Sequence, residues 1–298
     1  MNKYYKLSLI FILAVFVFSN CSVKRITIDS TALFMDDISD SFFEEGDIDF
    51  AEQAIPANLK LLEGLIKGSS YENDNLLLKG CKMFGMYAMG FIEDATTDKK
   101  LDKKNLKRAS VFYEKAKDYG LMIFKKKSDF KSALEGTIED FIKILPAFNE
   151  NDIELLFWTA FAWGSYINLN KTSPYAIADL PKVKAMMERV IELNDKYFYG
   201  LPHLFMIVYY SMPKMFGGNL EKAKEEYDKI IRISEDKFVL ADFFMAKYYA
   251  VAAQDKELFL KLLNKIENAS DDIIKEKLFT QVAKKKSLIL KEKIKDLF

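Results

Sequence analysis

The chain has 298 residues, of which 50% are hydrophobic, and its 44 basic side chains are balanced by 44 acidic ones. This near-neutral balance argues against nucleic acid as a partner, because phosphate binding needs concentrated positive charge. The single histidine excludes a metal site built on a pair of histidines within the chain, and the two cysteines are too few for a thiol cluster. Motifs typical of hydrolases, zinc proteases and phosphate-binding loops are missing, so we expect neither enzyme activity nor a cofactor.

Residues 1–20 are predicted to be a lipoprotein-type signal peptide. Two lysines precede an apolar run over residues 7–18, which is too short to span a bilayer comfortably. The run leads to Phe18-Ser19-Asn20-Cys21, which resembles a bacterial lipobox, so we expect lipid attachment at Cys21 and a periplasmic, membrane-anchored protein. Phe18 and Asn20 depart from the usual lipobox residues, and an ordinary signal peptide or an N-terminal anchor helix is the alternative.

After a tether over residues 21–36, the pattern from residue 37 to residue 298 predicts one all-helical domain. Apolar residues recur at helical spacing, glycine is sparse, and strand-like alternation is nearly absent. The predicted helices are Asp47–Lys67, Asn73–Glu93, Lys104–Lys126, Leu134–Leu145, Asn151–Leu169, Lys182–Asn194, Leu201–Met212, Leu220–Ile233, Val239–Ala253, Lys256–Asn268 and Asp271–Leu297. In the last of these, Ser270 is the expected N-cap.

The helix predicted over residues 220–233 has the clearest pattern. Leu220, Ala223 and Tyr227 fall on one apolar face, while the opposite face is charged and is expected to pair Lys222 with Glu226. Gly217 and Gly218 permit a preceding turn, and Asn219 is the predicted N-cap. The small side chain of Ala223 would let a partner helix approach closely.

Cys81 has no disulfide partner if Cys21 carries a lipid. It lies near Met83 and Met86 in an apolar helical pattern. We therefore predict that Cys81 is a small core residue.

A faint internal repeat is visible in the chain. Residues 46–51 and 218–223 share a polar turn followed by alanine at the same offset, and a weaker copy starts at Gln254. The second helix of a tetratricopeptide repeat (TPR) begins in a similar way. The repeat predicts stacked antiparallel helix pairs in a degenerate TPR-like solenoid, in which each pair buries a face that it cannot cover alone.

An ordered set of short motifs resembles the T-component lipoproteins (TatT-like) of TRAP transporters. The set comprises Ala162-Trp163-Gly164, Ala178-Asp179-Leu180-Pro181, Gly200 with His203, and Pro213 followed by residues 217–223. The resemblance covers most of the chain after the signal peptide and is best from residue 151 to residue 298. It implies an all-helical periplasmic lipoprotein that forms homotrimers with apolar cavities or pores and works with the periplasmic substrate-binding (P) subunit. Asn219 stands where the pattern usually has Asp, and both residues cap helices.

Five residues in the best-matching stretch are candidates for the lining of a ligand cavity, namely Trp163, Tyr166, Asp179, His203 and Tyr210. Each also has a plainer interpretation, which we favour. The aromatic residues would pack between paired helices. Asp179, just before Pro181, would cap a helix, and His203 would be a hydrogen-bonded core or rim residue.

The function expected from these observations is that of a lipid-anchored accessory component of a TRAP-type system. It would bind or channel a small hydrophobic organic ligand and dock the substrate-binding subunit. The alternative is a membrane-tethered TPR-like scaffold that binds proteins and no small ligand.

Overall fold

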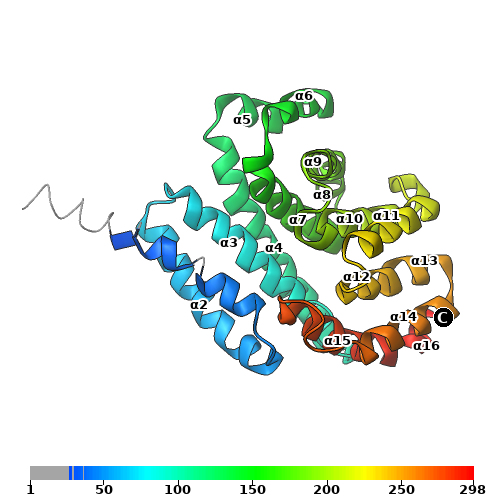
Figure 1. Cartoon of the computed structure of the whole chain (residues 1–298). Helices are drawn as coiled ribbons and strands as arrows, with labels where there is room; N and C mark the ends of the chain where they lie inside the picture. Colours follow the sequence, from blue (N-terminus) through cyan, green and yellow to red (C-terminus); the bar gives the residue numbers. More distant parts are fainter. Residues whose placement is uncertain (1–26, 29, 36) are drawn as a thin grey trace, which may run out of the picture.

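The computed structural model describes residues 27–28, 30–35 and 37–298, and every regular element within these ranges is a helix (Figure 1). The all-helical prediction is confirmed for this part of the chain. The signal peptide and Cys21 lie outside the described residues. The described residues from 27 to 43, which exclude 29 and 36, are helical and include the buried Ile28, Ala32 and Met35. Their helical spacing forms an apolar face, so the described part of the expected tether packs onto the domain.

Most of the remaining chain forms long helices joined by short connections. The long helices are α2 (Ile48–Gly68), α3 (Asp74–Tyr87), α4 (Lys99–Lys125), α7 (Ile153–Leu169), α9 (Leu180–Leu193), α10 (Tyr197–Tyr210), α11 (Leu220–Ile233), α14 (Lys256–Asn268) and α15 (Lys277–Glu292). The shorter ones are α5 (Ser128–Glu135), α6 (Ile138–Ile144), α8 (Pro174–Ala178), α12 (Val239–Phe244), α13 (Val251–Ala253) and α16 (Ile294–Leu297). Two π-helical segments, η1 (Ala88–Ile92) and η5 (Met245–Ala250), continue α3 and α12, and η2 (Leu145–Ala147), η3 (Glu150–Asp152) and η4 (Lys214–Phe216) are 3-10 turns. Within the described ranges, none of these helices combines the length and the apolar content that crossing a membrane requires.

The helices form a curved row that the C-terminal helices close. Each of α2, α3, α4, α7, α9, α10 and α11 packs against the next one in this order. The last helices, α12, α14 and α15, pack on one another, and α15 also reaches α2 (Figure 1). Neighbour-by-neighbour packing is what a stacked arrangement requires, and the TPR-like character of the pairs stays a prediction.

Contacts between aromatic rings hold the C-terminal helices against the start of the row. The ring of Phe279 in α15 lies 5.4 Å from that of Phe43, 5.2 Å from that of Phe198 and 5.9 Å from that of Phe238. Beside them, Lys285 pairs with Glu52 of α2 at 2.6 Å. Side chains that are far apart in the sequence thus hold the two ends of the row together.

The connection between α10 and α11 has the predicted geometry. Gly217 adopts a left-handed φ of 93°, and a Cβ on Gly218 would overlap the backbone carbonyl of Met212. The side chain of Asn219 accepts a hydrogen bond from the backbone N–H of Lys222 at 3.1 Å, which confirms the N-cap. α11 spans the predicted residues, and Ala223 is fully buried.

Other helix bounds differ from the prediction for local reasons. α4 begins five residues early because Asp98 accepts a backbone hydrogen bond at 2.8 Å and caps it. The helix predicted over residues 134–145 is divided by the break at Gly136. Ser270 accepts a hydrogen bond within a turn, and α15 starts only at Lys277, so the N-cap predicted at Ser270 is wrong.

Cys81 lies in the core, as predicted. Its side chain is fully buried, and its sulfur lies 4.0 Å from the hydroxyl of Thr159. Burial raises the pKa of the thiol to about 12, so Cys81 is an unreactive packing residue at neutral pH.

Candidate functional site

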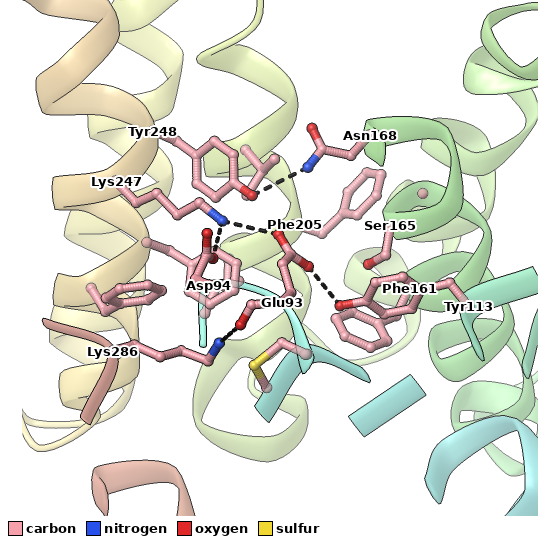
Figure 2. A pocket seen from close by; sticks show the side chains of 16 residues that line it. Glu93, Asp94, Tyr113, Phe161, Ser165, Asn168, Phe205, Lys247, Tyr248 and Lys286 are labelled. Carbon is pink, nitrogen blue, oxygen red and sulfur yellow. Dashed lines mark hydrogen bonds and ion pairs between the residues drawn. The ribbon is translucent and has the colours of Figure 1, made fainter. Parts of the chain in front are cut away.

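The closed row of helices forms a ring. A small cavity of about 50 Å³ lies inside it, where η1, α4, α7, α10, α12, η5 and α15 converge (Figure 2). One wall is apolar and comes mainly from α7, α10 and α12. The opposite end is polar and charged. The apolar lining residues are Met89, Phe161, Gly164, Leu204, Phe205, Val208, Phe243 and Phe244, and the polar ones are Glu93, Asp94, Tyr113, Ser165, Asn168, Lys247, Tyr248 and Lys286.

Backbone irregularities bring the polar residues to this point. Glu93 directly follows the π-helix η1, and Lys247 lies inside the π-helix η5. A π-helical turn is wider than an α-helical one and turns the following side chains to a different face, and such segments are frequent at functional sites. Asp94 adopts a left-handed φ of 52°, a conformation that a non-glycine residue keeps only when its surroundings hold it.

The charged side chains form one hydrogen-bonded network. The Lys247 Nζ lies 2.5 Å from Asp94 Oδ2 and 3.0 Å from Glu93 Oε1. Tyr113 donates its hydroxyl hydrogen to Glu93 Oε2 at 2.8 Å. Lys286 donates to the backbone carbonyl of Glu93, as Figure 2 shows. Side chains of α4, η5 and α15 thus all bind the two residues that follow η1.

The pKa values of this network follow from burial and mutual attraction. Burial alone would raise the pKa of Asp94, but Lys247 and Lys286 outweigh it and hold that pKa below its usual value. Burial opposes the charge of Lys247, yet Asp94 and Glu93 raise its pKa well above the usual range. For Lys286 burial prevails over the two carboxylates and lowers the pKa to about 8. At neutral pH Asp94 and Lys247 therefore form an ion pair.

Two uncharged groups complete the polar end. Asn168 donates through Nδ2 to the Tyr248 hydroxyl at 3.2 Å, while its Oδ1 is buried and has no hydrogen-bond partner among the described residues. Ser165 lines the cavity one helical turn before Asn168. A buried acceptor without a partner is costly, so Asn168 keeps hydrogen-bonding capacity that the described residues do not use.

A second cavity, of about 30 Å³, lies next to the first, between the helix over residues 27–43, α2, α3, η1 and α15. Its lining is almost entirely apolar and includes Phe42, Met83, Met86 and Leu278. Met89 lines both cavities. A flexible methionine side chain is therefore all that the two linings share.

None of the five residues predicted from the sequence lines either cavity. Trp163 is buried, and its indole donates a hydrogen bond to Asp179. Burial raises the pKa of Asp179 against the opposing influence of Lys182 and this hydrogen bond. The Asp179 side chain makes no cap hydrogen bond at the start of α9, so the N-cap interpretation is wrong.

The other candidates make contacts within the helical packing. His203 is buried, with Nδ1 2.5 Å from Glu226 Oε2, and its interpretation as a hydrogen-bonded core histidine is confirmed. Tyr166 and Tyr210 are half-buried and face lysine ammonium groups, at 4.7 Å and 5.6 Å from the ring centres. Glu226, which was expected on the solvent face of α11, is buried against His203 and Lys229 instead.

Two of the helices that carry predicted residues, α7 and α10, also line the central cavity, but with other residues. Some residues on these two helices that line the cavity are immediate neighbours of the predicted ones, such as Ser165 next to Tyr166 and Leu204 next to His203. One residue corresponds to about 100° of rotation on a helix, so a neighbour faces another direction. A signal was available for Lys247, which with Asp242 is one of only two charged residues in the stretch over residues 239–253.

Comparison with known proteins agrees with this architecture. The sequence model of the family described as TRAP transporter T-component matches residues 44–298, which is most of the chain and all of the helices that line the central cavity. The chain is also 22% identical, over an alignment of 242 residues, to an uncharacterized protein of Treponema pallidum (strain Nichols); the alignment covers 72% of this chain and 73% of that protein. The family is one of transport accessory components and not a known enzyme family. The chain therefore belongs to the TRAP transporter T-component family and has an accessory role in a TRAP transport system.

Proposed function

We propose that this protein is anchored to a membrane in the periplasm through lipid on Cys21, binds a small hydrophobic organic molecule, and docks the substrate-binding subunit of its TRAP system as a homotrimer. Family membership over residues 44–298 is the observation that carries the proposal. Import itself would be driven by separate membrane components.

The central cavity supports the ligand part of the proposal. Its wall offers phenylalanine rings, and its far end offers hydrogen-bonding groups around Asn168 and Lys247, an arrangement typical of sites for small organic molecules. At about 50 Å³ the cavity has room for only a few waters. It is too small for an organic ring, since an apolar cavity that admits benzene measures about 150 Å³. Ligand binding therefore requires side chains to move. Displacement of Met89 would join this cavity to its apolar neighbour.

Native mass spectrometry of the protein purified from membranes tests both the ligand and the assembly. We expect a trimer that retains a small organic molecule. Ser165→Leu, which fills the cavity, should abolish the retained mass, whereas Thr172→Leu, which adds the same side chain to the exposed connection before α8, should leave it unchanged. An unliganded monomer in all three preparations would favour the scaffold alternative.

Docking is tested with the purified substrate-binding subunit of the TRAP system from the same cells. Sedimentation velocity of the mixture should show a complex larger than either protein alone. Ser165→Leu should still form this complex if docking uses the outer surface. The variant therefore distinguishes a failure of the ligand part of the proposal from a failure of the docking part. No complex with any such subunit would contradict the docking part.

A further inference from the structure

The N-terminal helical hairpin, formed by residues 27–43 and α2, exposes large apolar side chains. Leu33 and Phe34 are 67% and 65% exposed on the first helix, and Leu61 is 52% exposed on α2. Single exposed apolar residues are ordinary on a protein surface, so the observation that matters is their grouping on one hairpin.

The register of the hairpin brings these residues to the same level. The two helices run in opposite directions (Figure 1), and Ile28 packs against Gly68. Because both helices rise by the same amount per residue, six residues further along each of them Phe34 lies level with Leu62, next to Leu61 in the chain. The neighbours of Leu61 on the exposed face of α2, Ala57 and Gly64, are uncharged and small.

The proposed anchor lies close to this hairpin along the chain. Cys21 precedes Thr27, the first described residue, by six positions, and six residues span at most about 20 Å. Phe34 follows about 10 Å further along the helix. A lipid on Cys21 would therefore hold this face of the hairpin within a short distance of the bilayer surface.

We propose that Leu33, Phe34 and Leu61 form a membrane-contact surface that rests on zwitterionic phospholipid. The inference depends on the proposed anchoring at Cys21, which raises the local lipid concentration so that a small apolar patch suffices. The charges around the patch are mixed, with Lys60 next to Leu61 and Asp37 one turn after Phe34 on the exposed sides of their helices. Such a rim matches headgroups that carry both signs better than a purely anionic surface.

The contact would orient the whole ring. The hairpin lies at one side of the molecule, and α10 and α11 lie at the other (Figure 1). With Phe34 and Leu61 on the bilayer, the connection between α10 and α11, where Met215 is 82% exposed, faces away from it. That side is then free for a periplasmic partner.

Tryptophan quenching by brominated phosphatidylcholine tests this surface in the full lipid-modified protein. The native Trp158 and Trp163 are only 1% and 5% exposed and do not reach lipid. Phe34→Trp and Leu61→Trp should each lose about half of their added emission in vesicles with brominated chains compared with unbrominated ones. The control Met215→Trp, at a position that is more exposed but on the far side, should lose none.

Vesicle-bound protein in which Phe34→Trp and Met215→Trp respond alike would overturn the proposal. It is also overturned if Phe34→Trp emission shifts to the blue with rising protein concentration in the absence of lipid, because a second copy would then cover the patch. Protein that does not float with vesicles contradicts the anchoring and not the surface. In that case the chain from Cys21 onward is coupled through Cys21 to a maleimide phospholipid. Cys81 is buried and does not react. The same quenching measurement on this coupled protein then tests whether Phe34 and Leu61 contact lipid.

Discussion

At the scale of single residues, the buried charges distinguish this protein from an ordinary helical stack. Lys286 is 3% exposed, and it donates a hydrogen bond to the backbone carbonyl of Glu93. Lys247, in contrast, binds two carboxylates directly. Burial lowers the pKa of both lysines, but the two carboxylates outweigh it at Lys247, so only the pKa of Lys286 moves towards neutral pH.

The depressed pKa of Lys286 should make its contribution to the free energy of unfolding more favourable at alkaline pH than at neutral pH. The folded protein releases this proton near pH 8, whereas the unfolded chain holds it to about pH 10.5, so the unfolded state binds more protons in between. The free energy of unfolding of the wild type, relative to Lys286→Met, should therefore rise by about 3 kcal/mol from pH 8 to pH 10.5. Urea denaturation at several pH values measures this difference. A difference that stays constant with pH would contradict the depressed pKa.

Glu226 and Glu225 are adjacent on α11 but have different roles. Glu226→Ala removes the partner of a buried histidine and should lower the free energy of unfolding by about 2–4 kcal/mol. Glu225→Ala, on the exposed side, should change it by less than about 0.5 kcal/mol. Since the pKa of Glu226 is lowered, against burial, by His203 and Lys229, part of the difference should vanish as the pH falls below 4.5. Equal losses of unfolding free energy in the two variants at pH 7 would refute the structural role of the Glu226–His203 contact.

At the scale of elements, turns and caps explain where the sequence predicted the structure well. The glycine pair and Asn219 before α11 act locally, and α11 has the predicted bounds. The regular right-handed part of α10 starts at Leu201, as predicted, because residues 198–200 are left-handed. Local signals of this kind depend on a few adjacent residues and need no knowledge of the partner helices.

The turn before α11 can be tested against a second glycine. Gly218→Ala would drive a methyl group into the Met212 carbonyl and should cost about 1–3 kcal/mol of unfolding free energy. Gly64→Ala, inside α2 with open space around it, should instead stabilise the protein by about 0.5–1 kcal/mol. Thermal and urea denaturation of both variants would show the opposite signs, and a neutral Gly218→Ala would disprove the close approach.

The polar end of the cavity could not be predicted in the same way. Glu93, Lys247 and Lys286 come from segments far apart in the chain, and Lys247 alone stands out in its segment, without any indication of what it faces. Lys286 in particular belongs to a run of three lysines that is typical of a solvated helix face. Only the tertiary closure of α15 onto the residues after η1 brings these charges together.

At the scale of the whole molecule, α15 packs against α2 and Phe43, and this contact closes the row of helices into a ring. An open row of helices unfolds in parts, because each helix contacts only its neighbours. Phe279, by contrast, touches rings from the start, the middle and the C-terminal third of the chain. We therefore expect a single cooperative unfolding transition for residues 27–298.

Phe279→Ala should lower the free energy of unfolding by about 3–5 kcal/mol, because it leaves a cavity among three other rings. The matched control is Phe50→Ala, at an exposed position of α2, which should change it by less than about 0.5 kcal/mol. Calorimetry compares the two variants and counts transitions. Two separate transitions in the wild type would contradict closure as the source of cooperativity.

The two π-helical segments have a consequence for the history of the chain. A π-turn holds one residue more than an α-turn, so η1 and η5 each read as a helix into which a single codon was inserted. Without the extra residue in η1, Glu93 and Asp94 would swing about 100° round the helix axis and leave the centre. Family members that lack these residues should align with one-position gaps here, and they should also lack the lysine that corresponds to Lys247.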